Sequence, residues 1–366
     1  MSEVLLGLEG VTPQWITAVL SAKGLLTQGQ VHTIHCSQQR ISIALVAHLE
    51  LGYSTDASPG APSRLVVKMT RPEEPSQRGS PLGKKEVAFY SALANVTAGL
   101  PVPSCYDAVY SAPEGRYHLL LEDLSLTHML IPLPPTRFQS EQAIDCLARL
   151  HARWWDDPDV ANTLGTAWTA ENTRILCRWA ETTFIAFADW VGDGLSPRRR
   201  TLYEHVLAAL PAFLERLTCG KHLTLGHGDA HLRNFLFPRT EERDSVSLLD
   251  WDSCGVAVGA VDLSYLLILH WMPEQRAMME QPLLRRYHLR LREHGIMQYS
   301  WENLWHDYRW SIIVQHLLSP LQHWSLESWS RDLGRNFWWN QLERSFRAFD
   351  DGICEELLKD DSSHGM

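Results

Sequence analysis

The sequence predicts an α+β fold with a small, β-rich N-terminal lobe and a large, mainly helical C-terminal lobe. Short apolar and β-branched runs typical of strands lie at residues 31–36, 41–52, 64–68, 105–111 and 116–122. After Asp123 the pattern changes, and apolar residues recur at helical spacing over 139–155, 170–218 and from 262 onward. We therefore expect two lobes, residues 1–122 and residues 123–366, with the boundary near 122–126.

Local signals place two helices and one turn in the N-terminal lobe. Thr12-Pro13 resembles an N-cap followed by proline at the first helical position, and this helix should end at Gly24. A second helix is expected from Lys84 to Leu93. The polar residues 37–40 predict a turn between the first two strands, and the polar stretch 71–83 predicts a loop.

Composition narrows the class of protein. The chain has 366 residues, 45% hydrophobic and 21% charged, which is typical of a globular protein of two lobes. Its net charge of −10 argues against nonspecific nucleic-acid binding. The seven cysteines form no CxxC pair, which indicates reduced thiols and a cytoplasmic location. We expect no membrane span, because no run of about 18 apolar residues occurs; the oligomeric state is left open.

One segment carries the residue types that phosphoryl transfer requires. In His227-Gly228-Asp229 through Asn234, the aspartate can accept the proton of an incoming hydroxyl, and the asparagine oxygen can bind a metal. Sixteen residues later the apolar run 246–249 ends in Asp250. A carboxylate at the end of a buried strand is a poor choice for packing but a good Mg²⁺ ligand.

An Asp and an Asn at this spacing also have an ordinary explanation. Such a pair arises by chance about once in a chain of this length and composition, and a lone aspartate after a strand usually belongs to a turn. The joint pattern is more specific, because the HGD motif, the Asn, an apolar strand and Asp250-Trp251-Asp252 follow one another in order. We therefore predict Asp229 as the catalytic residue and Asn234 and Asp250 as metal ligands.

Lys68 and Glu86 complete the predicted nucleotide site. Lys68 ends an apolar strand, and Glu86 lies near the start of the next helix. A lysine on a surface strand would need no partner, whereas a buried lysine requires an opposite charge. We predict a Lys68–Glu86 ion pair that holds the lysine on the nucleotide phosphates.

The apolar strand 119–122 leads into the boundary between the lobes. Its exposed backbone is expected to hydrogen-bond adenine at Glu122 and Leu124, without help from the side chains. The alternative is a simple strand end.

Taken in order, these segments resemble the aminoglycoside phosphotransferase and choline kinase-like family, and within it the branch of ecdysteroid kinase-like proteins. The resemblance covers residues 31 to about 270. The matching segments are Leu65–Lys68, Glu86–Tyr90, Leu100–Pro103, Leu119–Leu124, Leu147–His151, His227–Asp229 with Asn234, Leu248–Trp251, and Gly259 with Asp262-Leu263.

The resemblance implies a protein-kinase-like fold and transfer of the ATP γ-phosphate to the hydroxyl of a small molecule. It implies ATP and Mg²⁺ as cofactors, Asp229 as the base, and Asp262 as a residue that braces the catalytic loop. His151 and His227 are expected to be structural.

One segment departs from the family pattern. The turn expected to cover the phosphates, residues 37–42, contains no glycine, although glycine normally lets backbone N–H groups approach phosphates closely. Ser42, Ser37, Gln38 or Gln39 are the candidates to contact the phosphates instead. This departure leaves the choice between ATP and GTP open.

The acceptor substrate is the part of the function that the sequence specifies least. Fourteen of the 15 tryptophans lie from Trp154 onward, and we expect most of them to pack in the core and a few to line a pocket for a ring-shaped alcohol. Acidic residues could instead meet an amine; the candidates are Asp156, Asp157, Glu171 and Glu181. Two alternatives to a small-molecule kinase are a catalytically idle nucleotide-binding relative and a protein kinase. Only 11 residues separate Asp250 from Asp262, which argues against the activation segment of a protein kinase.

Overall fold

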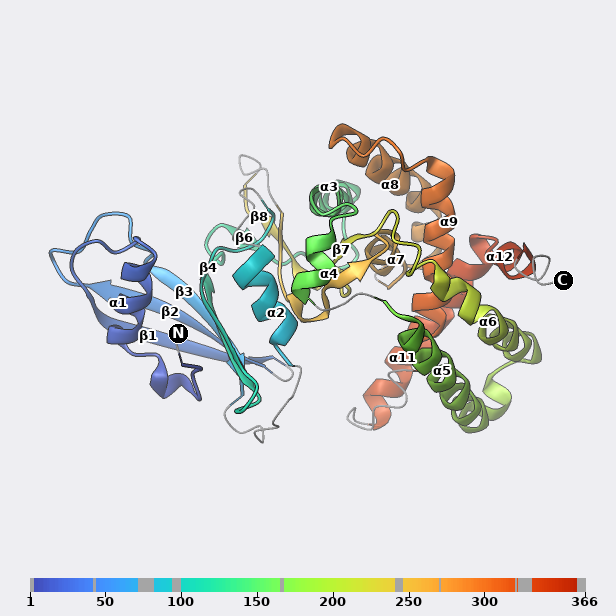
Figure 1. Ribbon diagram of the computed structural model, residues 1–366, viewed down its shortest axis with the longest axis horizontal. Coiled ribbons are helices and arrows are strands. Elements are labelled where there is room, and N and C mark those ends of the chain that lie inside the picture. The colour runs from blue at the N-terminus through green and yellow to red at the C-terminus, as the bar shows by residue number, and fades with distance from the viewer. Residues whose placement is uncertain are drawn as a thin grey trace. The chain divides into compact units, whose positions relative to one another are not determined.

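The computed structural model describes residues 3–41, 44–71, 82–93, 100–164, 168–240, 246–269, 271–319, 321 and 331–360. The chain forms two compact units (Figure 1). The first comprises Met1–Leu130 and Asn234–Cys254, and the second comprises Ile131–Arg233 and Gly255–Met366. The lobe boundary after residue 122 stays a prediction. The segment Asn234–Cys254, which carries both predicted metal ligands, belongs to the first unit.

The first unit is built on a five-stranded antiparallel sheet with the strand order β1-β2-β3-β5-β4. A three-stranded sheet, β6-β8-β9, completes its strands. Its elements are α1 (Pro13–Ala22), β1 (Val31–Ile41), β2 (Ala44–Tyr53), β3 (Arg64–Thr70), α2 (Lys84–Ala88) with a following π-helical turn (Phe89–Leu93), β4 (Cys105–Ser111), β5 (Arg116–Glu122), β6 (His128–Met129), β8 (Phe235–Pro238), β9 (Ser247–Leu248), and short 3-10 turns at Leu8–Gly10 and Trp251–Ser253.

Helix α1 covers one face of the five-stranded sheet, as Figure 1 shows. The Thr12 side chain caps the helix by accepting a hydrogen bond from the Trp15 N–H at 3.1 Å, which confirms the predicted start. Ile16 and Leu20 of α1 are fully buried against the sheet. Along β3, Leu65, Val67 and Met69 join this core. Since alternate residues of a strand point to opposite faces, Lys68 lies on the face away from α1.

The predicted turn at residues 37–40 is wrong. Strand β1 continues to Ile41, and Ile41 pairs with Ala44 at the start of β2. The polar residues 37–40 occupy the strand because their backbone pairs with residues 45–48 of β2, and cross-strand pairing outweighs their local preference for a turn. Ser42 lies outside the described residues, as does most of the predicted loop 71–83.

The second unit is mainly helical. Its elements are α3 (Arg137–Arg153), α4 (Pro158–Leu164), α5 (Ala170–Val191), α6 (Pro197–Glu215), β7 (Thr224–Gly226), β10 (Gly255–Ala257), α7 (Ala260–Leu269), α8 (Pro273–Glu293), α9 (Trp301–Ser311) with a following π-helical segment (Ile312–Leu317), α11 (Arg331–Asp351), α12 (Glu355–Asp360) and a 3-10 turn at Gly192–Gly194. A further 3-10 turn, Leu232–Asn234, ends the predicted catalytic loop (residues 227–234), and its last residue belongs to the first unit. The predicted helical texture after Asp123 is confirmed.

Two features of the second unit position the predicted catalytic loop. Strands β7 and β10 pair antiparallel, with Gly226 opposite Gly255, so the residues that follow β7 start from a fixed strand end. Helix α7 begins directly after β10 and carries Asp262 in its first turn. No helix within the described part of the chain is long and apolar enough to cross a membrane.

Candidate active site

The first unit brings Lys68, Glu86 and Asp250 into one ion cluster. Lys68 Nζ lies 2.7 Å from Glu86 Oε2 and 2.7 Å from Asp250 Oδ1. The Lys68 side chain is only 15% exposed and that of Glu86 is 1% exposed, whereas Asp250 is 50% exposed. The predicted Lys68–Glu86 ion pair therefore forms. Of the three side chains in the cluster, Asp250 is the most exposed.

The cluster keeps Lys68 charged. Burial alone disfavours an ammonium group. The carboxylates of Glu86 and Asp250 and the phenol of Tyr117 outweigh burial and raise the pKa of Lys68. The lysine is thus a fixed positive charge, which is what a group that binds phosphate oxygens requires.

Asp250 has an uncommon backbone conformation. Its φ of 65° and ψ of 72° lie in the left-handed region, which non-glycine residues rarely adopt. The following residue anchors the turn: the Trp251 ring stacks on Phe89 with centroids 3.8 Å apart, and the Trp251 N–H donates to Glu86 Oε1 at 3.3 Å. Strained residues of this kind cluster at functional sites, and here the strain turns Asp250 toward Lys68.

Asn234 lies beside Asp250 through strand pairing. Phe235 of β8 is opposite Leu248 of β9, and the Asn234 carbonyl accepts from the Leu249 N–H at 2.9 Å. Asn234 is 7% exposed. The two predicted metal ligands are therefore neighbours, although 16 residues separate them in sequence.

The donor set fits a hard divalent cation. Asp250 and Asn234 offer carboxylate and amide oxygens, which are ligands that Mg²⁺ prefers. Among the described residues, no group of three or more His, Cys, Asp or Glu side chains could hold a metal ion. An ion bound here would need further oxygens from phosphates or water.

Helix α2 is clamped at its N-terminus by two residues that the sequence did not suggest. The Gly83 N–H donates to Asp252 Oδ1 at 2.8 Å. Gly83 has a φ of 73°, and a Cβ atom built on it would lie 2.1 Å from Cγ of Tyr117, which is buried. Only glycine fits here, and the clamp ties the helix that carries Glu86 to the segment that carries Asp250.

We expect Gly83→Ala to destabilise the protein strongly. The left-handed conformation costs alanine about 1–2 kcal/mol, and the clash with a buried ring adds about 1–3 kcal/mol. Gly24→Ala is the matched control, since Gly24 has a φ of 71° and nothing within 4 Å of a built Cβ. Urea unfolding of both variants measures the difference, and equal losses of stability would show that Tyr117 does not restrict this position.

The predicted adenine-binding backbone lies at the end of β5. The Glu122 N–H donates to the Ser104 carbonyl at 2.9 Å, and its carboxylate accepts from the Ser104 hydroxyl at 3.0 Å. The Leu124 carbonyl accepts from the N–H groups of Thr127 and His128. The Leu124 N–H has no hydrogen-bond partner among the described residues. The role of Glu122 and Leu124 in binding adenine stays a prediction.

In the second unit, Asp262 holds the backbone of the predicted catalytic loop at His227 and Gly228. Its Oδ2 accepts from the His227 N–H at 2.7 Å, and its Oδ1 accepts from the Gly228 N–H at 2.9 Å. Burial disfavours its charge, but hydrogen bonds from His151 and the His227 backbone hold the pKa of Asp262 below its usual value. The predicted bracing by Asp262 is confirmed.

A buried histidine and tyrosine support Asp262 in turn. His151 Nε2 lies 3.1 Å from Asp262 Oδ2, and His151 Nδ1 lies 2.7 Å from the Tyr287 hydroxyl. A carboxylate can only accept, so His151 Nε2 carries a proton and donates to Asp262. A Cβ on Gly259 would lie 2.6 Å from the Tyr287 hydroxyl, so glycine is required beside this chain of hydrogen bonds.

The predicted base, Asp229, projects from the braced loop. Its N–H donates to His227 Nδ1 at 3.3 Å, which is consistent with a structural role for His227. Its carboxylate lies 3.4 Å from His231 Nε2. Burial, and after it the negative charge of Asp229, raises the pKa of Tyr265 on α7. Asp229 is 30% exposed. Sequence reasoning missed Tyr265, since nothing in its local pattern distinguishes it from other helix residues.

A neutral histidine, His316, contacts the ring of Tyr265. His316 is fully buried, contacts the Tyr265 ring at a centroid distance of 5.8 Å, and hydrogen-bonds Ser264 at 2.9 Å. Burial lowers the pKa of His316 from 6.5 to about 3.

Because of His316, we expect the free energy of unfolding to fall at acidic pH. Below pH 6.5, His316 binds a proton in the unfolded chain, whereas in the folded protein it binds one only at about pH 3. Stability should therefore fall by about 1.4 kcal/mol per pH unit below pH 6.5, or about 2 kcal/mol at pH 5. His316→Gln should flatten this slope in urea unfolding, whereas His205→Gln, at an exposed position on α6, should not. An unchanged slope in His316→Gln would mean that other groups set the acid sensitivity.

The tryptophan and acidic candidates for acceptor binding are mostly engaged elsewhere. Trp154, Trp251, Trp271 and Trp310 are buried, which confirms the core interpretation for these four. Trp324, Trp329 and the Trp338 side chain lie outside the described residues. Among the acidic candidates, Asp156 accepts from the Leu223 N–H at 2.9 Å, and Glu171 pairs with Arg174 at 2.6 Å. An amine-binding role for these acids stays a prediction.

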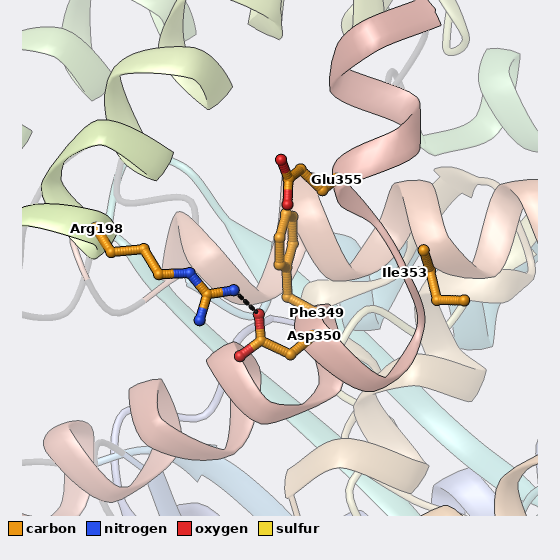
Figure 2. A pocket seen from close by; sticks show the side chains of 5 residues that line it. All are labelled: Arg198, Phe349, Asp350, Ile353 and Glu355. Atoms are coloured by element: carbon orange, nitrogen blue, oxygen red, sulfur yellow. Dashed lines mark hydrogen bonds and ion pairs between the residues drawn. The ribbon is translucent and has the colours of Figure 1, made fainter.

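A pocket of about 320 Å³ lies elsewhere in the second unit (Figure 2). An Arg198–Asp350 ion pair of 2.8 Å crosses it. Its lining residues are Arg198, Phe349, Asp350, Ile353 and Glu355. None of the predicted site residues belongs to it, so this pocket gives no support to an acceptor site.

Comparison with known proteins identifies the family. The model of the phosphotransferase enzyme family matches residues 53–298, and the chain belongs to this family. A search of the curated proteins found no match.

Several solved structures are similar to this chain, and one of them reaches a TM-score of 0.50. An ethanolamine kinase from Plasmodium vivax has 13% identity and a TM-score of 0.50, covering 90% of this chain and 87% of its own. An aminoglycoside-3'-phosphotransferase of type VIII has 20% identity and a TM-score of 0.45, covering 76% and 93%. An amicoumacin kinase in complex with AMP-PNP, Ca²⁺ and Ami has 15% identity and a TM-score of 0.49, covering 93% and 96%. The predicted family and its protein-kinase-like α+β fold are confirmed; the ecdysteroid kinase-like branch stays a prediction.

Proposed function

We propose that this protein is an ATP- and Mg²⁺-dependent kinase that phosphorylates a hydroxyl group of a small molecule. The observation that carries the proposal is the Lys68–Glu86–Asp250 ion cluster in a member of the phosphotransferase family. The cluster combines a fixed positive charge with a half-exposed carboxylate, which are the two parts needed to hold a metal–nucleotide complex.

The residues of the first unit would bind the nucleotide. Lys68, held by Glu86, would contact the phosphates, and Asp250 and Asn234 would hold Mg²⁺ by their side-chain oxygens. When bound, Mg²⁺ supplies positive charge to the phosphate oxygens. Lys68 and Asp250 form an ion pair of 2.7 Å. Nucleotide binding would replace this ion pair with contacts from Lys68 to phosphate and from Asp250 to the metal. The backbone of Glu122 and Leu124 would hydrogen-bond the adenine.

Asp229 would act on the acceptor. Its carboxylate would take the proton of the acceptor hydroxyl as the oxygen bonds to the γ-phosphorus, while the bond from that phosphorus to the β-phosphate oxygen breaks and ADP leaves. The Asp262 brace supports this role, because two backbone N–H groups within two residues of Asp229 are fixed at 2.7 and 2.9 Å. Such fixation keeps the base from moving away from its substrate.

A screen for ADP release tests this proposal. Hydroxylated metabolites and antibiotics would be incubated with Mg-ATP and either wild-type protein or Asp229→Asn. We expect at least one acceptor to release ADP with the wild type and not with the variant. If no compound did so and Mg-ATP also failed to bind, the proposal would be wrong. Binding of Mg-ATP without ADP release from any compound would favour the catalytically idle nucleotide-binding relative.

A further inference from the structure

Helix α2 begins at a residue that cannot cap it with a side chain. Gly83 is the N-cap residue and has no side chain that could accept a hydrogen bond from the first turn. Glu86 stands three positions later, at N3. In a capping box, a glutamate at N3 turns back and accepts a hydrogen bond from the backbone N–H of the N-cap residue. The local sequence therefore offers Glu86 a partner other than Lys68, namely the Gly83 N–H.

Asp252 accepts from that N–H group instead. The Gly83 N–H donates to Asp252 Oδ1 at 2.8 Å, although the two residues are 169 positions apart. Glu86 is directed to other partners: its Oε1 accepts from the Trp251 N–H at 3.3 Å, and its Oε2 lies 2.7 Å from Lys68 Nζ. Asp252 thus supplies the acceptor that Glu86 would supply in a capping box, and Glu86 stays beside the lysine.

The turn that follows the predicted metal ligand contacts α2 at three points. Gly83, Glu86 and Phe89 follow one another at intervals of three residues, so they lie along one side of the helix. Asp252 contacts the first of them, the Trp251 backbone contacts the second, and the Trp251 ring stacks on the third with centroids 3.8 Å apart. The stacked rings are fully buried. The contact at Gly83 is the one that depends on a single side-chain oxygen.

We propose that Asp252 is a positioning residue for Lys68. By accepting from the Gly83 N–H, it keeps Glu86 on the lysine and so keeps the lysine on the nucleotide phosphates. The inference rests on the proposed function, since it assigns a helper to the phosphate-binding group of that reaction. Without Asp252, the Gly83 N–H and Lys68 would compete for the Glu86 carboxylate.

Two substitutions at one position separate the acceptor from the rest of the side chain. Asp252→Ala removes the oxygen that accepts from the Gly83 N–H. Asp252→Asn keeps an amide oxygen that can accept the same hydrogen bond, so it should restore most of what Asp252→Ala loses. Asp252→Leu also lacks an acceptor and serves the same test if Asp252→Ala does not fold.

Thr12→Ala is the matched control. The Thr12 side chain also accepts a backbone N–H at the start of a helix, that of Trp15 in α1, at 3.1 Å and within the same unit. Helix α1 lies on the face of the sheet opposite to Lys68. Thr12→Ala should therefore lower the stability of the protein without changing the surroundings of the lysine.

The first test measures Lys68 without any nucleotide. Each protein would be treated briefly with an amine-reactive acetyl ester, and mass spectrometry would compare acetylation of Lys68 with that of Lys23, an exposed lysine of the same unit. Lys68 is only 15% exposed and is held in an ion pair, so it should react slowly in the wild type. We expect the ratio to rise about tenfold in Asp252→Ala, and to stay near the wild-type value in Asp252→Asn and Thr12→Ala. An unchanged ratio in Asp252→Ala would overturn the proposal.

The second test measures nucleotide affinity. Calorimetry with Mg²⁺ and a non-hydrolysable ATP analogue should give a Kd about tenfold higher for Asp252→Ala than for the wild type, with most of the affinity regained in Asp252→Asn. Thr12→Ala should unfold at lower urea concentration and keep the wild-type Kd. An equal Kd for Asp252→Ala and the wild type, or an equal loss in Thr12→Ala, would contradict a role of Asp252 in positioning the lysine.

The two tests separate the inference from the proposed function. If the wild type bound no Mg-nucleotide while acetylation of Lys68 still rose in Asp252→Ala, Asp252 would stand as the residue that positions Lys68 and the proposed reaction would fall. If the wild type bound the nucleotide and transferred phosphate, and Asp252→Ala matched it in both tests, the inference would fall alone.

Discussion

Replacing Asp229 by asparagine is expected to reduce phosphoryl transfer by about 10²–10⁴-fold, the usual contribution of a positioned proton acceptor. Asparagine keeps the shape of the side chain and its contact distance to His231 but cannot take a proton at neutral pH. The loop should remain in place, because Asp262 holds the N–H groups of His227 and Gly228.

The Asp229→Asn loss should appear in kcat and not in nucleotide binding. Lys68, Asn234 and Asp250, which we assign to the nucleotide and metal, belong to the first unit and are unaltered. Steady-state kinetics with the acceptor and calorimetry with a non-hydrolysable ATP analogue measure the two effects. Asp193→Asn, at an exposed position after α5, is the matched control. Turnover of Asp229→Asn within a few-fold of the wild type would show that another group accepts the proton.

Replacing Asp250 by asparagine should weaken Mg²⁺-dependent nucleotide binding by about 10–100-fold, since a charged hydrogen-bonding partner typically contributes about 1.5–3 kcal/mol. Asparagine is preferable to alanine here because Asp250 has a φ of 65°. Asparagine tolerates the left-handed conformation, so the change removes charge without adding backbone strain.

The absence of Mg²⁺ provides an internal control. Lys68 contacts Asp250 Oδ1 at 2.7 Å, and the neutral side chain competes less for the lysine. Metal-free nucleotide should therefore bind Asp250→Asn at least as well as it binds the wild type. Calorimetric titrations should show that Asp250→Asn weakens nucleotide binding with Mg²⁺ and does not weaken it without Mg²⁺. Asp56→Asn, an exposed change in the same unit, should alter nucleotide affinity in neither condition. The same Mg²⁺ dependence in Asp250→Asn and the wild type would remove Asp250 from the metal site.

Local sequence signals predicted much of the fold correctly. The Thr12 cap, the helix that ends before Gly24, and the strands 105–111 and 116–122 all form where expected. These signals succeed because caps, turns and alternation act within a few residues. The turn at residues 37–40 failed because those residues are polar yet pair with β2, and pairing depends on a partner strand that a local pattern does not contain.

Part of the candidate site could likewise be predicted from the sequence, and part of it could not. The order Lys68, Glu86, Asp229, Asn234 and Asp250 is visible in the sequence. The structure places Lys68 in contact with Glu86, as predicted, and also with Asp250, a contact that was not predicted. The clamp between Gly83 and Asp252 joins residues 169 apart, and the hydrogen bond between His151 and Tyr287 joins residues 136 apart. Contacts of this kind arise from tertiary packing, so no local signal could have revealed them.

Product analysis tests the central claim most directly. Wild-type protein, Asp229→Asn and Asp250→Asn would each be incubated with ATP labelled at the γ-phosphate, Mg²⁺ and the acceptor found in the screen, and the label would be followed by mass spectrometry. We predict that the wild type forms a phosphate monoester of the acceptor that carries the label, and that neither variant forms it at a comparable rate. Unlabelled acceptor in the wild-type reaction, or equal labelling in all three, would contradict the assignment of this chain as a small-molecule kinase that uses Asp229 and Asp250.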